Sequence, residues 1–322
     1  MRVKRGLGVL GAAAAAVIVA AAALLLGAQG GWLPRPAREK VEVKLPPPPA
    51  GALAPLDPAL AEATSDGPLP RVGADGRLPW QVYARPFPAA ERRPLVAIVV
   101  TGLGLDAAAA QAAADRLPAP VTLAFSPYAQ NLPALIGAAR RAGHEVMLGL
   151  PMEPADFPRQ DPGPETLLTS LDPPENLARL RWTMSRGGAY VGLAAIMGER
   201  FTAAKANLAP VLDAIKARGL LFVDGASPDS VSGELARQIG LAWSHADRAI
   251  GGETDPAAID AALAALETAA IKTGASLGMA TFEPELADKI AAWAPTLPGK
   301  GLVLAPATAV AAREAHPTKA SP

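Results

Sequence analysis

From Leu95 onward, short apolar runs alternate with longer stretches in which alanine and leucine recur at helical spacing. The runs are LVAIVV (95–100), VTLAF (121–125), EVMLGL (145–150), YVGLAAIM (190–197), LLFV (220–223), LAWS (241–244), ASLGMA (275–280) and GLVLA (301–305). Short apolar runs bounded by turn residues are typical of buried strands. Eight such strand–helix repeats in about 220 residues predict an α/β fold whose parallel strands close, or nearly close, into a barrel. A doubly wound open sheet is the structural alternative.

Three of the intervening stretches have recognisable helix ends. Residues 172–186 begin with Asp, Pro and Glu at the spacing of an N-cap, a first helical position and a capping box. Residues 202–219 end at a glycine and contain Pro210, which predicts a kink. Residues 255–274 begin with Asp-Pro and also end at a glycine. We therefore expect helices over these three segments.

The N-terminal region has a different pattern. Residues 1–6 are basic, and residues 7–28 form an uncharged, alanine-rich run. A helix of these 22 residues would span roughly 33 Å, enough to cross the hydrocarbon core of a membrane. The run predicts a single-pass anchor with a cytoplasmic basic segment, or alternatively a cleaved signal sequence. Both interpretations place the main domain outside the cytoplasm, either anchored to the membrane or secreted.

Residues 29–93 are rich in proline. Of the 34 prolines, 13 lie between Leu33 and Ala90, and those at 46–49 are consecutive. Consecutive prolines form neither a helix nor a sheet ladder, so this segment predicts an extended linker. Its later part, GRLPWQVYARPF, is expected to lie against the domain as a lead-in segment. We expect the barrel to occupy residues 94–312, followed by a polar tail at 313–322.

Composition narrows the possible chemistry. The chain has 30 basic and 30 acidic residues, and this balance argues against a nucleic-acid surface, which needs clustered cations. It has no cysteine, which excludes thiol catalysis, disulfides and cysteine-ligated zinc. Its three histidines are His144, His245 and His316.

The site of a parallel barrel lies at the carboxyl ends of its strands. The first predicted strand ends in IVVTGLG (98–104), where the apolar run stops at Thr101 and Gly102. This stretch contains no acid, His or Cys. Any chemistry must therefore be assembled from the ends of the other strands.

Several segments, in order along the chain, resemble the divergent polysaccharide deacetylase family, relatives of the NodB-type carbohydrate esterases. They are AGHEVMLGLPMEP (142–154), DPGPETLLTSL (161–171), GAYVGLAAIMGERFTA (188–203) and ARGLLFVDGASPDS (217–230). The lead-in segment is also similar to that family. The resemblance covers residues from about 66 to about 312, and implies a distorted (β/α) barrel and descent from metal-dependent de-N-acetylases.

The resemblance also implies what an active member needs. A zinc-type ion held by an acid and two histidines polarises the acetamide and activates a bound water. In the family, these ligands are an Asp-Asp pair after the first strand, a His before Leu-Pro-Met-Glu, and a His in Asn-His-Met-Gly-Ser. Here the corresponding positions are Thr101 and Gly102, Gly149, and Ile196. None of these side chains replaces a His or carboxylate ligand, so we expect no metal cofactor and no catalytic set.

The remaining polar residues give candidates for a residual or binding site. His144 lies at the amino end of a predicted strand and is expected to form core hydrogen bonds, while His316 is expected in the solvated tail. His245, in SHAD, lies near a strand end, although a surface turn is the alternative. A single histidine with scattered carboxylates does not make a closed zinc set.

Four other residues are candidates. Glu153 and Arg200 match retained family positions at strand ends, where they could bind sugar hydroxyls or brace the rim of the barrel. Asp224 could be a residual site group or part of an Asp-Gly turn, and Tyr128 could stack on a sugar face.

The leading hypothesis is a bacterial envelope protein with a catalytically degenerate deacetylase-like barrel that binds a cell-envelope glycan or an envelope protein. It would be a single-pass protein of the inner membrane with its main domain in the periplasm, or alternatively a protein secreted to the periplasm. One alternative is an active deacetylase or hydrolase of N-acetylated glycans that uses a rearranged site with Glu153, Asp224 and His245. Another is a scaffold in the envelope that binds no glycan. Nucleic-acid partners are not expected.

Overall fold

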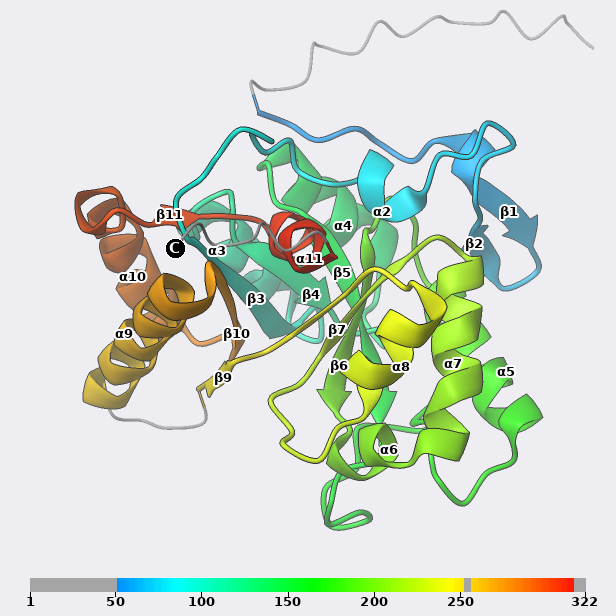
Figure 1. Cartoon of the computed structure of the whole chain (residues 1–322). Helices are drawn as coiled ribbons and strands as arrows, with labels where there is room; N and C mark the ends of the chain where they lie inside the picture. The colour runs from blue at the N-terminus through cyan, green and yellow to red at the C-terminus, as the bar shows by residue number, and fades with distance from the viewer. Residues whose placement is uncertain (1–50, 252–255, 316–322) are drawn as a thin grey trace, which may run out of the picture. The chain divides into compact units, whose positions relative to one another are not determined.

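The computed structural model describes residues 51–251 and 256–315 (Figure 1). The predictions of a basic segment, an anchor or signal sequence and the first part of the linker fall on residues outside this range, as does His316 in the tail. Within the described residues, no helix is long and apolar enough to span a membrane.

A curled parallel sheet forms the centre of the domain. Its strand order is β8-β7-β6-β5-β4-β3-β10-β9, and β11 pairs with the first residues of β3. The strands are β3 (Leu95–Leu103), β4 (Thr122–Phe125), β5 (Val146–Met152), β6 (Gly192–Met197), β7 (Leu221–Asp224), β8 (Trp243–His245), β9 (Arg248–Ile250), β10 (Ala275–Thr281) and β11 (Val303–Leu304). Each predicted apolar run overlaps one of these strands, which confirms the parallel α/β fold. The short β9 was not predicted.

Helices follow the strands along the chain, and all except α11 pack on the outer face of the sheet. They are α3 (Ala107–Arg116), α4 (Leu132–Arg141), α5 (Pro173–Ser185), α6 (Glu199–Ala203), α7 (Lys205–Ala217), α8 (Ser232–Ile239), α9 (Pro256–Thr273), α10 (Pro284–Trp293) and α11 (Ala307–Ala315). The N-cap of α5 is as predicted, since the Asp172 carboxylate accepts a 2.9 Å hydrogen bond from the backbone N–H of Glu175.

The helix predicted over 202–219 is wrong at its beginning. Two helices, α6 and α7, meet at Ala204, whose ψ of 84° is not helical. The carbonyl of Thr202 accepts the N–H of Val231 at 3.0 Å. This carbonyl is therefore partnered outside the helix, and α7 begins only at Lys205.

The two ends of the sheet are joined by one short segment of chain. Strands β8 and β9 lie at opposite ends of the strand order, yet only Ala246 and Asp247 separate them in sequence. The N–H of Ala246 donates to Asp224 in β7 at 3.0 Å, and the N–H of Asp247 donates to Leu277 in β10 at 2.8 Å. The segment 243–250 thus leaves one edge and joins the other, which gives the distorted (β/α) barrel.

Alternation along the strands separates two apolar cores. In β3, Val96, Ile98 and Val100 pack with the outer helices, whereas Leu95, Ala97 and Val99 belong to an inner cluster. The inner cluster contains residues of β4, β5, β7 and β10 together with helix α11. Successive side chains of a strand point to opposite faces, so the inner cluster fills the interior of the barrel.

Helix α11 closes the amino-terminal end of this interior (Figure 1). The buried carboxylate of Glu145, directly before β5, accepts hydrogen bonds from the N–H and the hydroxyl of Thr308 in α11. It also accepts from the hydroxyl of Thr122 and from the backbone N–H of Arg85 in the lead-in segment. One buried group therefore links α11, two strand starts and the lead-in segment.

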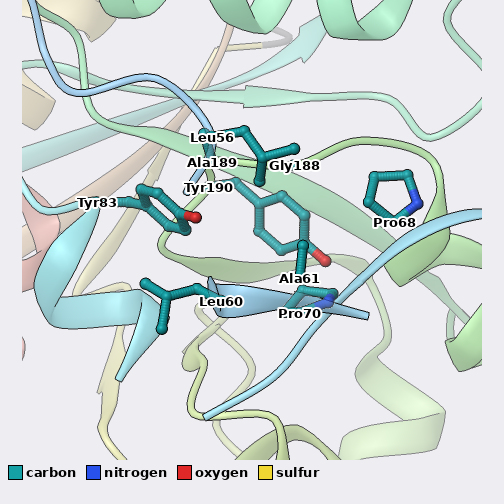
Figure 2. A pocket seen from close by; sticks show the side chains of 9 residues that line it. All are labelled: Leu56, Leu60, Ala61, Pro68, Pro70, Tyr83, Gly188, Ala189 and Tyr190. Carbon is teal, nitrogen blue, oxygen red and sulfur yellow. The ribbon is translucent and has the colours of Figure 1, made fainter. Parts of the chain in front are cut away.

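The lead-in region packs on the domain through a β-hairpin and the short helix α2 (Pro79–Val82). The hairpin strands are β1 (Ala61–Thr64) and β2 (Gly67–Pro70), which pair antiparallel. Behind the hairpin lies an apolar cavity between the rings of Tyr83 and Tyr190 (Figure 2). Its volume of about 10 Å³ is at the lower limit for a single water molecule, so it is a packing void rather than a ligand site.

Candidate functional site

The side chains at the three degenerate family positions share the carboxyl-terminal mouth of the barrel. Thr101, Gly149 and Ile196 each stand two residues after a member of the inner cluster: Val99, Met147 and Ala194, respectively. By alternation, all three face the interior. The fold therefore brings together at this mouth the positions that the family resemblance matches to metal ligands.

The residues present do not fit a zinc ion. The hydroxyl of Thr101 is buried and donates to the carbonyl of Ala280 at 3.1 Å, so it is engaged with the neighbouring strand. Gly102, with φ of 76°, has no side chain. A Cβ atom added to Gly149 would lie 2.8 Å from Cγ1 of Ile196 and 3.3 Å from its Cδ1. The isoleucine side chain thus occupies the space into which a ligand at position 149 would have to project.

The rim of the mouth is apolar in two places. Met197, which follows Ile196, is 40% exposed and has a φ of 59°, an uncommon conformation for a residue other than glycine. Leu105, in the loop after β3, is 72% exposed.

Glu153 and Arg200 form a brace beside the mouth. One carboxylate oxygen of Glu153 accepts from the N–H and the hydroxyl of Thr169, at 2.6 and 2.7 Å. The other accepts from Arg200 at 3.0 Å. Burial raises the pKa of Glu153, but the hydrogen bonds from Thr169 and Arg200 outweigh it, and the net pKa is lowered. Both oxygens of this carboxylate are therefore occupied within the protein.

Asp224 is held on the outer face of the sheet. It follows Val223 of the inner cluster, and its carboxylate accepts from the hydroxyls of Ser230 and Ser232 and from the N–H of Gly225. Burial raises the pKa of Asp224. The carboxylate thus anchors the loop that leads into α8. By alternation with Val223, the Asp224 side chain points away from the interior of the barrel.

His245 and Asp247 lie at the segment that joins the two edges of the sheet. Their side chains are 3.4 Å apart, and the imidazole stacks on Trp243. The carboxylate of Asp247 also accepts from the N–H of Leu277 at 2.9 Å. Leu277 stands four residues before Thr281, the partner of Thr101, which places Asp247 about 13 Å below the mouth along β10. Asp247 is thus not assembled with Thr101, Gly149 and Ile196. His245 is the last residue of β8 and pairs with Asp224 at the end of β7, so it lies at a strand end, as predicted.

The electrostatic surroundings of His245 are acidic. The hydrogen bond with Asp247 raises the pKa of the imidazole, against the effect of burial, and the charges of Glu314 and Asp224 act in the same direction. Within the described ranges, no three His, Asp or Glu side chains form a group that could hold a metal ion.

Tyr128 supports a neighbouring loop. Its hydroxyl accepts from the N–H of Glu165 at 2.9 Å, and its ring lies 5.3 Å from that of Trp182. A Cβ at Gly163 would lie 2.6 Å from the tyrosine ring, so the loop packs directly on it. His144 forms core contacts, as expected, with its ring nitrogens 2.9 and 3.1 Å from the carbonyls of Val121 and Ala114.

The buried Glu145 was missed at the sequence level. It lies in the run EVMLGL, where it begins a strand, and a carboxylate directly before a buried run was the available signal. Its partners come from residues 122 and 308 and from the lead-in segment, so no local pattern identifies them.

The sequence and the fold are similar to those of known proteins. Residues 98–311 match the divergent polysaccharide deacetylase family. The crystal structure of an uncharacterised protein from Agrobacterium tumefaciens C58 is similar, with a TM-score of 0.72 and 40% identity, covering 76% of this chain and 99% of that chain. A lactam utilization protein from Thermus thermophilus is 15% identical, with a TM-score of 0.42, covering 67% and 99% of the two chains. No curated protein matches this sequence. The chain belongs to the divergent polysaccharide deacetylase family.

Proposed function

We propose that this protein is a catalytically degenerate member of its family that binds a glycan of the bacterial cell envelope. The observation that carries the proposal is the contact between Gly149 and Ile196. Two positions that would each supply a histidine instead form one apolar pair, in which the larger side chain needs the space left by the glycine. Thr101, the third position, has a neutral hydroxyl that donates to the carbonyl of Ala280, and it provides no carboxylate for a metal ion.

The rearranged-site alternative receives little support from the contacts. Its candidate carboxylates, Glu153 and Asp224, each accept hydrogen bonds from neighbouring side chains and backbone N–H groups. Asp224 and His245 are partners across β7 and β8. A general base must reach the proton it abstracts, and alternation directs Asp224 away from the interior that Thr101, Gly149 and Ile196 face.

The test is metal content and acetate release, measured for the unmodified chain and for a variant with the family ligands restored. The variant carries Thr101→Asp, Gly102→Asp, Gly149→His and Ile196→His together. We expect the unmodified chain to bind no stoichiometric zinc and to release no acetate from N-acetylglucosamine oligomers. One tightly bound zinc per unmodified chain, or acetate release abolished by a chelator, would overturn the proposal. Zinc binding by the variant alone would support it.

We further propose that residues 7–28 hold the chain at the inner membrane and that the linker carries the barrel into the periplasm. Protease treatment of spheroplasts should then digest the barrel while the cytoplasmic markers survive. Pull-down of envelope proteins from solubilised membranes, with and without residues 29–50, tests the protein-scaffold alternative. Capture of one stoichiometric protein partner without retention on glycan would favour the scaffold.

A further inference from the structure

A second hollow in the domain lies outside the mouth of the barrel. It has a volume of about 330 Å³, within the range of small-ligand pockets. Three segments enclose it: the turn of the β1–β2 hairpin, the loop between β4 and α4, and the end of α5. Its lining includes Asp66, Tyr128, Gln130, Asn131, Leu132 and Arg186.

The walls of this pocket are fixed by packing. Tyr128 is held by the Glu165 N–H and by its ring contact with Trp182. On the opposite side, a Cβ at Gly67 would lie 2.1 Å from the carbonyl oxygen of Ser185, so the hairpin turn packs closely on the end of α5. A ligand would therefore meet a pocket that is already formed, which reduces the entropy lost on binding.

Two carboxamides in the lining have no partner. The side chains of Gln130 and Asn131 are exposed and form no hydrogen bond with any described residue. Asn131 stands at the N-cap of α4, where an asparagine usually accepts from the first turn, but here it makes no side-chain cap. Its φ of 53° is in the left-handed region. Both amides are available as donors and acceptors to a bound molecule.

Arg186 supplies a positioned cation. Its Nε donates to the carbonyl of Pro127 at 3.1 Å, and its guanidinium lies 5.0 Å from the ring centre of Trp182. These two contacts orient the side chain, yet within the described residues no carboxylate pairs with it. The terminal nitrogens of such a guanidinium match a carboxylate in a bidentate geometry.

We infer that this pocket binds an acidic saccharide. Hydroxyl groups of a sugar suit the two carboxamides and the carboxylate of Asp66, since each hydroxyl both donates and accepts. The apolar side of the ring suits the wall made by Tyr128 and the exposed Pro133. A carboxylate on the sugar would pair with Arg186, which otherwise lacks a counter-ion among the described residues. The inference rests on the proposed glycan-binding function and adds the location and the charge of the ligand.

The experiment measures dissociation constants by ligand-observed NMR with the full chain. The probes are N-acetylmuramic acid and glucuronic acid as acidic sugars, and N-acetylglucosamine as a neutral one. We expect the acidic sugars to bind at least about tenfold more tightly than the neutral one. Arg186→Gln should remove that preference. The double variant Gln130→Ala, Asn131→Gly should weaken the binding of all three sugars, because both carboxamides are lost. Glycine is chosen at position 131 because it tolerates the left-handed backbone conformation.

Arg181→Gln is the matched control, since Arg181 is exposed on the same helix and does not line the pocket. Thermal melts of every variant establish that it is folded. Saccharide binding that is unchanged in the pocket variants would overturn the location and leave the proposed function standing. Equal affinity for acidic and neutral sugars would overturn the assigned charge. If the unmodified chain binds no saccharide at all, both this inference and the glycan-binding function fail.

Discussion

Replacing Gly149 by alanine tests directly whether Ile196 occupies the space at the degenerate site. The added Cβ would lie 2.8 Å from Cγ1 of Ile196, closer than such atoms normally approach. Overpacking of this kind costs roughly 1–3 kcal/mol. Alanine regains about 0.5–1 kcal/mol over glycine within a strand. We therefore expect Gly149→Ala to destabilise the domain by about 1–2 kcal/mol, or roughly 2–8 °C in melting temperature.

A double-mutant cycle isolates the contact itself. Ile196→Ala alone removes half-buried hydrocarbon, which should cost about 1 kcal/mol. In the double variant the clash is absent, so Gly149→Ala should then be neutral or slightly stabilising. The two changes should therefore couple by about 2 kcal/mol, well beyond the roughly 0.3–0.5 kcal/mol scatter of independent sites.

The assay is urea and thermal unfolding of the four proteins of the cycle, monitored by circular dichroism. Gly225→Ala is the matched control: a Cβ there meets only the carbonyl of Met197, at 3.7 Å, although the glycine also follows a barrel strand. Additive effects of Gly149→Ala and Ile196→Ala would refute the packing argument. So would a Gly149→Ala protein more stable than the parent.

Three further predictions concern buried or paired charges. Glu145→Ala leaves buried donors of Thr308 and its other partners unsatisfied, and should destabilise the domain by about 3–5 kcal/mol and expose α11 to limited proteolysis. The pKa of Glu153 is lower in the folded state than in the unfolded state, so its contribution to stability is present above the unfolded pKa and is lost as pH falls through the folded pKa. Glu153→Gln should therefore flatten the acid limb of a stability–pH curve. The pKa of His245 is raised in the folded state, so its contribution to stability is present below the unfolded pKa of about 6.5 and is lost as pH rises through the folded-state pKa. NMR titration should show a lower imidazole pKa in Asp247→Asn than in the parent.

Each of these has a control and an opposing result. Glu199→Gln changes an exposed neighbour of Arg200 and should leave the acid limb as it is. Glu175→Ala, on the surface of α5, should not alter proteolysis of α11. An unaltered acid limb in Glu153→Gln, a protease-resistant α11 in Glu145→Ala, or an unshifted imidazole in Asp247→Asn would contradict the corresponding contact.

The strands that the sequence identified most clearly are the central ones, which are buried on both faces. Val146 to Met152 of β5 are all buried, and such a strand is a continuous apolar run. The hairpin strands β1 and β2 were not identified, because they are short, half-exposed and interrupted by Pro68 and Pro70. The three-residue β9 is shorter than any window in which a period can be recognised.

The candidate site was predictable in its membership but not in its geometry. Strand parity alone indicates that Thr101, Gly149 and Ile196 face one interior. The stagger between strands depends on pairing register, which a single sequence does not reveal. Sequence position placed His245 at a strand end, and it is the last residue of β8. The pairing of Asp247 with Leu277, four residues before the end of β10, is a register that the sequence did not reveal.

The contact at the mouth also makes the order of substitutions matter. Ile196→His can use the space above Gly149, so that variant should fold with nearly the parental stability. Gly149→His, with Ile196 still present, must move a side chain that already lies within 2.8 Å of the new Cβ, and it should be destabilised by more than Gly149→Ala. Unfolding curves of the two single variants and the double variant decide the matter. If Gly149→His is the better tolerated of the two, Ile196 moves aside freely, and the apolar pair does not prevent a ligand set from forming there.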